Sequence, residues 1–393
     1  MDRRLLILAL GMFALGTDSF VVAGILPMVS RSMNVTVAVA GQMVTLYAIS
    51  YALLSPVVAA AAAHWPRKTL LLSALAVFVV GNVMTAMAPT LTMLFSSRLV
   101  AGLGAAMFSP TATAAGASLV PPEQRGRALA VIIAGLSSAT ALGSPIGTVL
   151  GGLGDWRITM WFVAALGLVS AVGIWVLLPH LPSPPPVSLR QRLAPMADSR
   201  VALTLLTTLC AYCGVFIVYT YVGVTFDRVT LGNGNILAAL LLIWGVAATT
   251  GNLVSGRLTD RLGSRRIING AILVAAVNFA LLPWSSAHLA TAVPALVVWG
   301  ICGWGLLVPQ QHRLLGIFPA MGPLLMGLNS GALYLGVSAS GLLGAVGITF
   351  LDKHYLGLFG ACFLALSLGL AELAHRRISL WPAGRLSPLD LPI

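Results

Sequence analysis

Asp18 and Arg98 are ionisable residues that lie well inside long apolar runs of this sequence. A charge at the depth of a bilayer core is costly unless it is paired or faces water, so such a residue indicates a functional site. Dehydration raises the pKa of a carboxyl group and a neighbouring cation lowers it, so a carboxylate that alternates between two environments can bind and release a proton. The sequence therefore predicts a proton-coupling site in which Asp18 carries the proton and Arg98 is its electrostatic partner.

The depths of the two residues are consistent with such a pair. Asp18 lies eight residues before the end of the first apolar run, about 12 Å at 1.5 Å per residue. Arg98 lies about six residues, about 9 Å, after the start of the fourth run, which crosses in the opposite direction. Direct or water-bridged pairing is therefore expected. The alternative is that Arg98 binds backbone carbonyls while Asp18 faces a separate water pocket.

Apolar runs of about 20 residues, each long enough to span a bilayer as a helix, must position these side chains. The chain has 393 residues, of which 58% are hydrophobic and 8% charged, whereas about 25% charged residues is usual in soluble proteins. This predicts an all-α integral membrane protein with twelve transmembrane helices. The expected spans are 5–26, 39–61, 69–88, 92–119, 126–150, 157–178, 200–224, 235–257, 267–284, 290–310, 321–347 and 355–374.

The distribution of basic residues predicts the topology. With the amino terminus inside, seventeen of the 22 Lys and Arg residues fall in inner loops and tails. Arg31, Arg157, Arg228 and Lys353 fall in outer loops, and Arg98 lies within the membrane. This bias places both termini in the cytoplasm and supports an even number of spans. The net charge of +12 is therefore explained by topology, and no nucleic-acid partner is expected.

A Pro-rich polar stretch at 179–199 divides the chain into two blocks of six spans. We expect an N-terminal bundle at 1–178, a cytoplasmic linker at 179–199, and a C-terminal bundle with a short cytoplasmic tail at 200–393. A polar, basic loop follows the second span of each block, which indicates two pseudo-symmetric repeats. A substrate site is then expected between the bundles near the midplane, with alternating access by rocking of the two bundles.

The loop after the eighth span carries the pattern G-x-L-x-D-R-x-G-x-R-R. Gly256 is expected to permit close helix approach and Gly263 a tight turn, and Asp260, among arginines, can accept charge-assisted hydrogen bonds. The pattern predicts a latch that closes the inner face in one conformation; the alternative is a merely topogenic basic loop. It resembles the signature cytoplasmic loop of the major facilitator superfamily, and the first-half copy is degraded. The residues concerned are Gly256, Asp260, Arg261, Gly263, Arg265 and Arg266.

Two further segments resemble the same family. In the fourth span, Arg98 is followed by small residues, as in the family motif whose arginine commonly takes part in proton coupling. In the fifth span, Gly143, Pro145 and Gly147 resemble the helix motif of antiporters, although Ala139 replaces its first glycine and Ser144 splits the Gly-Pro pair. The variant resembles the sugar-efflux and chloramphenicol-resistance branch. The alternative for this span is an ordinary kinked helix of small residues.

Polar and aromatic residues within the spans are candidates for the substrate cavity. Tyr47 and Tyr51 are four residues apart and share a helix face. For each candidate, packing or interfacial anchoring is an equally good explanation. His312 and Arg313 are expected at a helix end, in an inner loop. The candidates are Tyr47, Tyr51, Tyr219, Tyr221, Trp244, Asn252, Gln310, Asn329 and Tyr334.

The resemblance implies a proton-coupled antiporter that exports small lipophilic compounds or drugs across the cytoplasmic membrane. Efflux of a sugar or nucleoside is the main alternative; an importer, or an uncoupled receptor or scramblase, is a further one. No nucleotide-binding loop, metal-ligand cluster or catalytic constellation is found, so no enzyme activity and no cofactor other than the coupling proton is expected. The expected partners are a small-molecule substrate, protons and lipid, and the chain is expected to act as a monomer.

Overall fold

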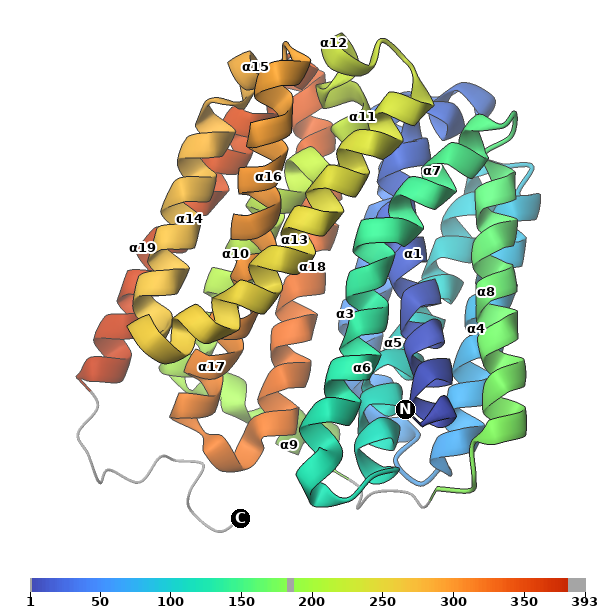
Figure 1. The fold of residues 1–393 in the computed structure, drawn as a ribbon, viewed down its shortest axis with the longest axis vertical. Helices are drawn as coiled ribbons and strands as arrows, with labels where there is room; N and C mark the ends of the chain where they lie inside the picture. The colour runs from blue at the N-terminus through green and yellow to red at the C-terminus, as the bar shows by residue number, and fades with distance from the viewer. Residues whose placement is uncertain (1, 182–186, 381–393) are drawn as a thin grey trace.

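The computed structural model describes residues 2–181 and 187–380, which fold into α-helices joined by short connections (Figure 1). The first half contains α1 (Arg3–Ser32), α2 (Val37–Ala40), α3 (Gln42–Ala61), α4 (Arg67–Met87), α5 (Leu91–Ser118), α6 (Arg125–Ser138), α7 (Ser144–Gly152) and α8 (Arg157–Leu177). The second half contains α10 (Ser199–Thr220), α11 (Val222–Thr225), α12 (Asp227–Thr230), α13 (Gly234–Leu262), α14 (Ser264–Ala280), α15 (Leu282–Ser285), α16 (Leu289–Gly305), α17 (Leu307–Ile317), α18 (Gly322–Phe350) and α19 (Leu356–Ser379).

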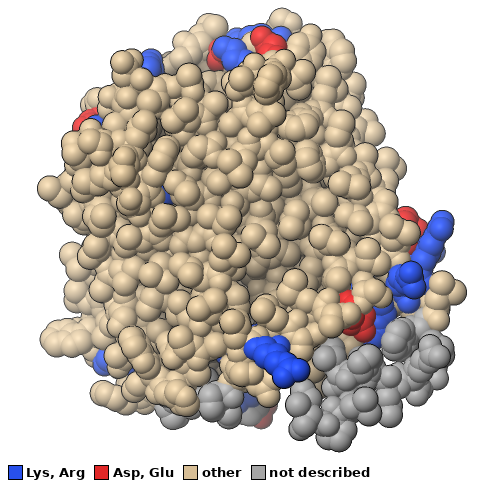
Figure 2. Space-filling view, turned by 180° about the vertical axis from the view of Figure 1, so that it is seen from behind, with Lys and Arg blue, Asp and Glu red and all other residues tan. Residues whose placement is uncertain are grey.

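Among the described residues, eleven helical stretches are long and apolar enough to cross a membrane. The ninth predicted span is formed by α14, which has 17 residues, followed after Leu281 by the short α15. The prediction of a twelve-helix membrane fold is therefore confirmed. On the face shown in Figure 2, most of the visible Lys, Arg, Asp and Glu atoms lie toward the two ends of the molecule, with a broad and largely uncharged belt between them. This belt is the surface that a bilayer would cover.

The two halves are built by the same helix pairings, as pseudo-symmetry requires. In the first half α1 packs on α6 and α8, and α5 packs on α3 and α4. In the second half the corresponding α10 packs on α18 and α19, and α16 packs on α13 and α14. Between the halves, α3 meets α18 and α7 meets α13, which are again equivalent pairs. In Figure 1 the two groups of helices stand side by side.

The predicted linker and tail are only partly described. Residues 182–186 of the linker, and residues 381–393 of the tail, lie outside the described residues. The described part of the linker contains α9 (Leu189–Leu193), whose first turn is held by a capping box between Ser188 and Gln191. From α9, Arg192 donates a hydrogen bond to the carbonyl of Ala59 at the end of α3, 3.1 Å away. The linker therefore lies against the first half.

The face at which α1 begins and α19 ends is here called the termini face, and the other is called the opposite face. Most hydrogen bonds between described residues of the two halves lie toward the opposite face, for example from Gln42 Nε2 to the carbonyl of Gly341, at 3.2 Å. The bond nearest the termini face runs from Thr249 Oγ1 to the carbonyl of Ser137, at 3.4 Å. Ser137 is twelve residues from the start of α6, about 18 Å along the helix. The halves are thus held together from mid-depth to the opposite face.

An ionic cluster on the opposite face ties α12 to the segment before α19. Asp227 accepts hydrogen bonds from Lys353 and from His354 Nε2, the latter at 2.8 Å. The His354 ring also contacts Asp352 through Nδ1. Partial burial acts to raise the pKa of Asp227, but the hydrogen bonds from Lys353 and His354 hold that pKa below its usual range.

Asp227→Asn should therefore change the pH dependence of stability. A carboxyl group whose pKa is lowered by folding stabilises the protein above its usual pKa range, and this contribution is lost as pH falls through the lowered value. The wild type should lose its melting-temperature advantage over the variant as pH falls below about 4. Thermal unfolding of the detergent-purified protein between pH 7 and 3 measures this. Glu123→Gln, at an exposed carboxylate that joins no ion pair with a described residue, is the control. A melting-temperature advantage independent of pH would contradict the prediction.

Candidate functional site

Asp18 and Arg98 form an ion pair in the interior of the first half. Arg98 Nη1 lies 2.7 Å from Asp18 Oδ1. The Asp18 side chain is fully buried and that of Arg98 is 1% exposed. The residues come from α1 and α5, which cross in opposite directions, as the depth argument requires. The structure thus joins the two side chains that sequence reasoning selected, by direct contact.

Asn82 and Tyr47 complete the surroundings of this pair. Asn82 Nδ2, on α4, lies 3.4 Å from Asp18 Oδ2 and 3.1 Å from the carbonyl of Phe78. The Arg98 guanidinium carbon lies 4.8 Å from the centre of the Tyr47 ring, a cation–π contact. Asn82 was missed by the sequence reasoning, although it is the only amide side chain in a third span without charged residues, which was the available signal.

The two buried charges depend on each other. A buried carboxylate and guanidinium stabilise each other, and removal of either charge leaves the other uncompensated. Loss of the Asp18 charge would therefore leave Arg98, whose Nε already lacks a hydrogen-bond partner among the described residues, without its counter-charge. Four helices, α1, α3, α4 and α5, each contribute a side chain to this cluster, so a change in its charge would affect the contacts of all four.

The fifth-span motif lies in close contact with α1. The α6–α7 crossing is interrupted by a π-helical turn at Ala139–Gly143. After one intervening residue follows Pro145, which cannot donate a backbone hydrogen bond. A Cβ added at Gly143 would lie 2.1 Å from Thr17 Oγ1, and one added at Gly147 would lie 2.3 Å from Val21. The two glycines therefore allow α7 to approach the part of α1 that carries Asp18.

Several cavity candidates meet at the contact between the halves. Tyr51 of α3 stacks on Tyr334 of α18, with ring centroids 3.9 Å apart. Tyr219 of α10 packs on Trp244 of α13, with centroids 4.5 Å apart. The Tyr219 hydroxyl donates to the carbonyl of Phe20 on α1, at 3.1 Å. These tyrosines lie across the interface that must move if the two halves rock.

Tyr221, a predicted cavity residue, lies instead at the opposite face. Its hydroxyl donates to the carbonyl of Gly341 at 2.7 Å, and its ring fills the space beside Gly41 of the first half and Gly344 of α18. Tyr221 therefore closes the opposite face rather than lining a central cavity.

The three amide candidates lie on helices of the second half and differ in burial. Asn329 is fully buried and its Oδ1 accepts a hydrogen bond from Thr208 at 2.9 Å. Gln310 is 1% exposed, and neither of its amide atoms has a partner among the described residues. Asn252 is half-buried. The expectation that Arg313 lies in a loop is wrong: α17 continues to Ile317, and Arg313 is a buried helical residue whose Nη1 contacts the carbonyl of Ala371 at 3.3 Å.

The predicted latch segment turns at Gly263, whose φ of +81° favours glycine. Gly256 makes no close helix contact, in contrast to the prediction, since a Cβ there would meet its nearest neighbour, Val308, at 3.8 Å. Asp260 is exposed and joins no ion pair with a described residue. Arg261 and Arg266 are also exposed at this face.

Arg265 of the same segment has an acidic partner, but it is not Asp260. Its Nη2 lies 2.7 Å from Glu372 Oε2 and its Nε 3.1 Å from Oε1, and Asn269 also contacts this carboxylate. Sequence reasoning missed Glu372, an acidic residue near the end of the last span. In this conformation the segment ties α14 to α19 within the second half, and it makes no ion pair with described residues of the first half.

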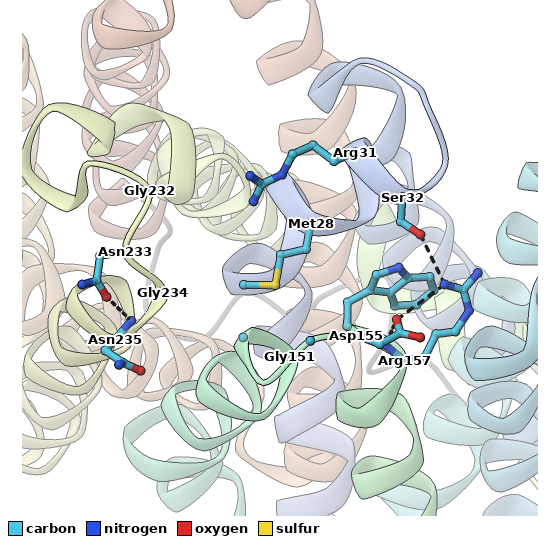
Figure 3. A pocket seen from close by; sticks show the side chains of 13 residues that line it. Met28, Arg31, Ser32, Gly151, Asp155, Arg157, Gly232, Asn233, Gly234 and Asn235 are labelled. Atoms are coloured by element: carbon cyan, nitrogen blue, oxygen red, sulfur yellow. Dashed lines mark hydrogen bonds and ion pairs between the residues drawn. The ribbon is translucent and has the colours of Figure 1, made fainter.

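A polar cavity of about 650 Å³ opens at the opposite face, away from Asp18 and Arg98 (Figure 3). It lies between Met28 and Arg31 of α1, the end of α7, and the loop that precedes α13. Asn233 and Asn235 line its second-half side. This cavity spans both halves but does not reach the buried ion pair.

Comparisons with known proteins give a consistent assignment. The sequence model of the Major Facilitator Superfamily matches residues 8–345. An inner membrane transport protein of Escherichia coli K12, YdhP, is 29% identical over 95% of this chain and 96% of its own. A chloramphenicol resistance protein of Streptomyces lividans is 34% identical over 66% of this chain and 68% of its own. The solved structure of the nucleoside transporter NupG covers 94% of this chain and 98% of its own, with a TM-score of 0.77 at 14% identity, a likeness of fold alone.

Proposed function

This chain belongs to the major facilitator superfamily, and we propose that within this family of transporters it is a proton-coupled antiporter that exports a small, fairly lipophilic compound. The observation that carries the proposal is the fully buried Asp18 carboxylate in contact with Arg98. A buried ionisable group inside a membrane protein is costly and indicates a proton or ion pathway. Inward movement of a proton through Asp18 would drive outward movement of the solute.

The charge distribution also indicates how the protein is oriented in the membrane. The termini face carries most of the basic residues, among them Arg3, Arg67, Arg125 and Arg261, which favours its placement in the cytoplasm. The membrane is then the cytoplasmic membrane, in agreement with the inner-membrane relative. With this orientation, a molecule whose halves meet from mid-depth to the opposite face is in an inward-facing conformation, the state in which an exporter receives its solute.

Two features support export of a lipophilic solute. The antiporter-type segment at Gly143–Gly147 packs directly on the part of α1 that carries Asp18, so the motif and the proposed coupling residue form one structural unit. The relative with 34% identity is named for resistance to chloramphenicol. Both features favour efflux of a drug-like compound over uptake of a nutrient.

In proteoliposomes containing the purified protein, addition of a transported solute should release protons from the lumen under an imposed pH gradient. A pH-sensitive dye trapped inside reports the movement, and chloramphenicol is the first solute to add. Protein-free liposomes under the same gradient are the control. Solute accumulation that is unaffected when the pH gradient is collapsed would contradict coupling.

A further inference from the structure

The polar cavity at the opposite face adjoins an apolar groove. The groove has a volume of about 360 Å³ and lies between α7 and α13, which stand side by side in Figure 1. Asn235 lines both the cavity and the groove. On α7, Gly151 and Gly152 line the cavity, and Leu150, which directly precedes them, lines the groove. The two spaces therefore follow one another along both helices.

The groove runs from the cavity toward the middle of the membrane. Because α7 ends and α13 begins at the opposite face, Pro145 and Leu242 are the deepest groove residues of the two helices. Leu242 lies seven residues beyond Asn235, about 10 Å along α13. Apart from Asn235 every residue that lines the groove is apolar, and Ile146 and Leu242 are exposed, so the groove is open to the surrounding bilayer. A polar pocket at the membrane surface above an apolar groove matches the polarity of a membrane lipid.

The charge of the cavity favours an anionic headgroup. Its charged lining residues are Arg31, Asp155 and Arg157, which give a net charge of +1. Arg157 is already engaged, because its Nη1 lies 3.5 Å from Asp155 and its Nη2 donates to the carbonyl of Ala88 at 2.9 Å. Arg31 is exposed and joins no ion pair with a described residue; its Nε donates to the carbonyl of Pro27 at 3.2 Å. Arg31 is therefore the cation that remains for a phosphate group.

The rest of the cavity wall is uncharged and offers room and hydrogen-bond donors. Five of its thirteen lining residues are glycines, and a Cβ added at Gly154 or Gly232 would meet no atom within 4 Å. A wall of this kind lets a ligand approach the backbone. Asn233 uses its Oδ1 to cap α13 through the backbone N–H of Asn235, which leaves its Nδ2 as a donor. In Figure 3 the Arg31 side chain extends from α1 toward this second-half side, so a phosphate would find donors from both halves.

We propose that the cavity and the groove together bind an anionic phospholipid of the phosphatidylglycerol class, with its phosphate at Arg31 and an acyl chain between α7 and α13. The groove supplies apolar contact to the chain, and the charge of Arg31 selects an anionic headgroup over a zwitterionic one. The site is separate from the buried Asp18–Arg98 pair, which the cavity does not reach. The inference goes beyond the antiport proposal and does not depend on the direction of transport.

A lipid in this site would bridge the two halves of the protein. The cavity and the groove are walled by α1 and α7 of the first half, and by α13 and the loop before it in the second. Separation of the halves at the opposite face would move these walls apart. The lipid therefore binds the present conformation more tightly than a conformation that is open at this face, and it shifts the population toward the closed one.

Native mass spectrometry of the delipidated, detergent-purified protein tests the site, with phosphatidylglycerol and phosphatidylcholine of the same acyl chains as competing probes. The wild type should prefer phosphatidylglycerol. Arg31→Gln removes the charge that no carboxylate neutralises and should reduce this preference about fivefold. Ala239→Phe fills the groove and should weaken binding of both lipids while their ratio stays the same. Arg228→Gln, at a cation of the same face outside the cavity, and Ala165→Phe, at an exposed position of α8, are the matched controls and should bind as the wild type does.

Two outcomes would overturn the lipid site. The first is equal affinity for the two lipids, or a preference that persists in folded Arg31→Gln. The second concerns glycerophosphoglycerol, which is the same headgroup without acyl chains and should not displace the lipid. If this soluble anion displaces phosphatidylglycerol in the wild type and in Ala239→Phe alike, the cavity binds free anions and the groove takes no part.

The bridging effect has its own measurement. Spin labels at Asn34 and Phe350, on the opposite face of the first and second halves, should give shorter distances in nanodiscs of phosphatidylglycerol than in nanodiscs of phosphatidylcholine. In Arg31→Gln the two lipids should give the same distances. Distances in the wild type that do not depend on the lipid would show that the bound lipid does not hold the halves together, and would overturn this part of the inference.

Discussion

Asp18→Asn should reduce solute-driven proton movement to the level of protein-free liposomes. Asparagine keeps the size and a hydrogen-bond acceptor of the side chain but cannot take up and release a proton. Exchange of labelled for unlabelled solute requires no net proton movement, so it should survive in the variant at a measurable rate. The luminal pH signal tests the loss of proton movement, and isotope exchange tests the survival of solute exchange. Both are recorded on the same proteoliposomes.

The same substitution should also weaken the fold, which must be separated from its effect on coupling. It leaves the buried Arg98 guanidinium without its counter-charge, and loss of one partner of a buried pair typically costs about 3 to 5 kcal/mol. Replacement of both partners by uncharged groups is often neutral. We therefore expect the double variant Asp18→Asn/Arg98→Met to recover most of the melting temperature and to remain uncoupled.

A second aspartate–arginine pair provides the matched control. Asp198 Oδ2 lies 2.7 Å from Arg200 Nη2 at the start of α10, and both side chains are less than one-tenth exposed. Asp198→Asn should lower stability but leave solute-driven proton movement intact, because this pair caps a helix at the termini face. Proton movement that persists in a folded Asp18→Asn variant would place the coupling group elsewhere and would end the assignment of Asp18.

The spans and the Asp18–Arg98 contact could be predicted from the sequence because they depend on one-dimensional properties. Apolar length determines which segments cross a membrane, and the rise of 1.5 Å per residue places two residues of antiparallel helices at one depth. A charge in such a segment has few ways to be satisfied. For these two residues, depth and charge were therefore enough to predict a contact between α1 and α5.

The remaining contacts depend on helix rotation and on neighbours far apart in the chain. The partner of Arg265 is Glu372, 107 residues away, rather than Asp260 five residues away, because α14 packs on α19. Asn82 reaches Asp18 only because α4 turns that face toward the pair. Tyr221 closes the opposite face because α10 ends just before it and the ring enters a gap between glycines of both halves. Sequence spacing does not specify such rotations.

Gly41→Ala should shift the protein toward a conformation that is open at the opposite face. A Cβ at Gly41 would lie 2.3 Å from the Tyr221 hydroxyl oxygen and 2.6 Å from its ring. The ring has little room to retreat, because its other edge already occupies the space that a Cβ would take at Gly344, and its hydroxyl is bonded to the carbonyl of Gly341. Overpacking of this kind costs about 1 to 3 kcal/mol, and 1.4 kcal/mol is a tenfold change in a population ratio.

The shift can be measured as a distance between spin labels at Asn34 and Phe350, which lie on the opposite face in the first and second halves. The distribution should move to longer distances in Gly41→Ala, and solute export should fall because the inward-facing state is depleted. Gly152→Ala is the matched control, since its Cβ would meet only the Met28 Cε atom, at 3.9 Å. An unchanged distance distribution in Gly41→Ala would contradict this prediction. It would mean that the contacts between the halves, such as the hydrogen bond from Gln42 to Gly341, are strong enough to displace the Tyr221 ring. Tyr221 would then fill the gap at the opposite face without controlling whether that face opens.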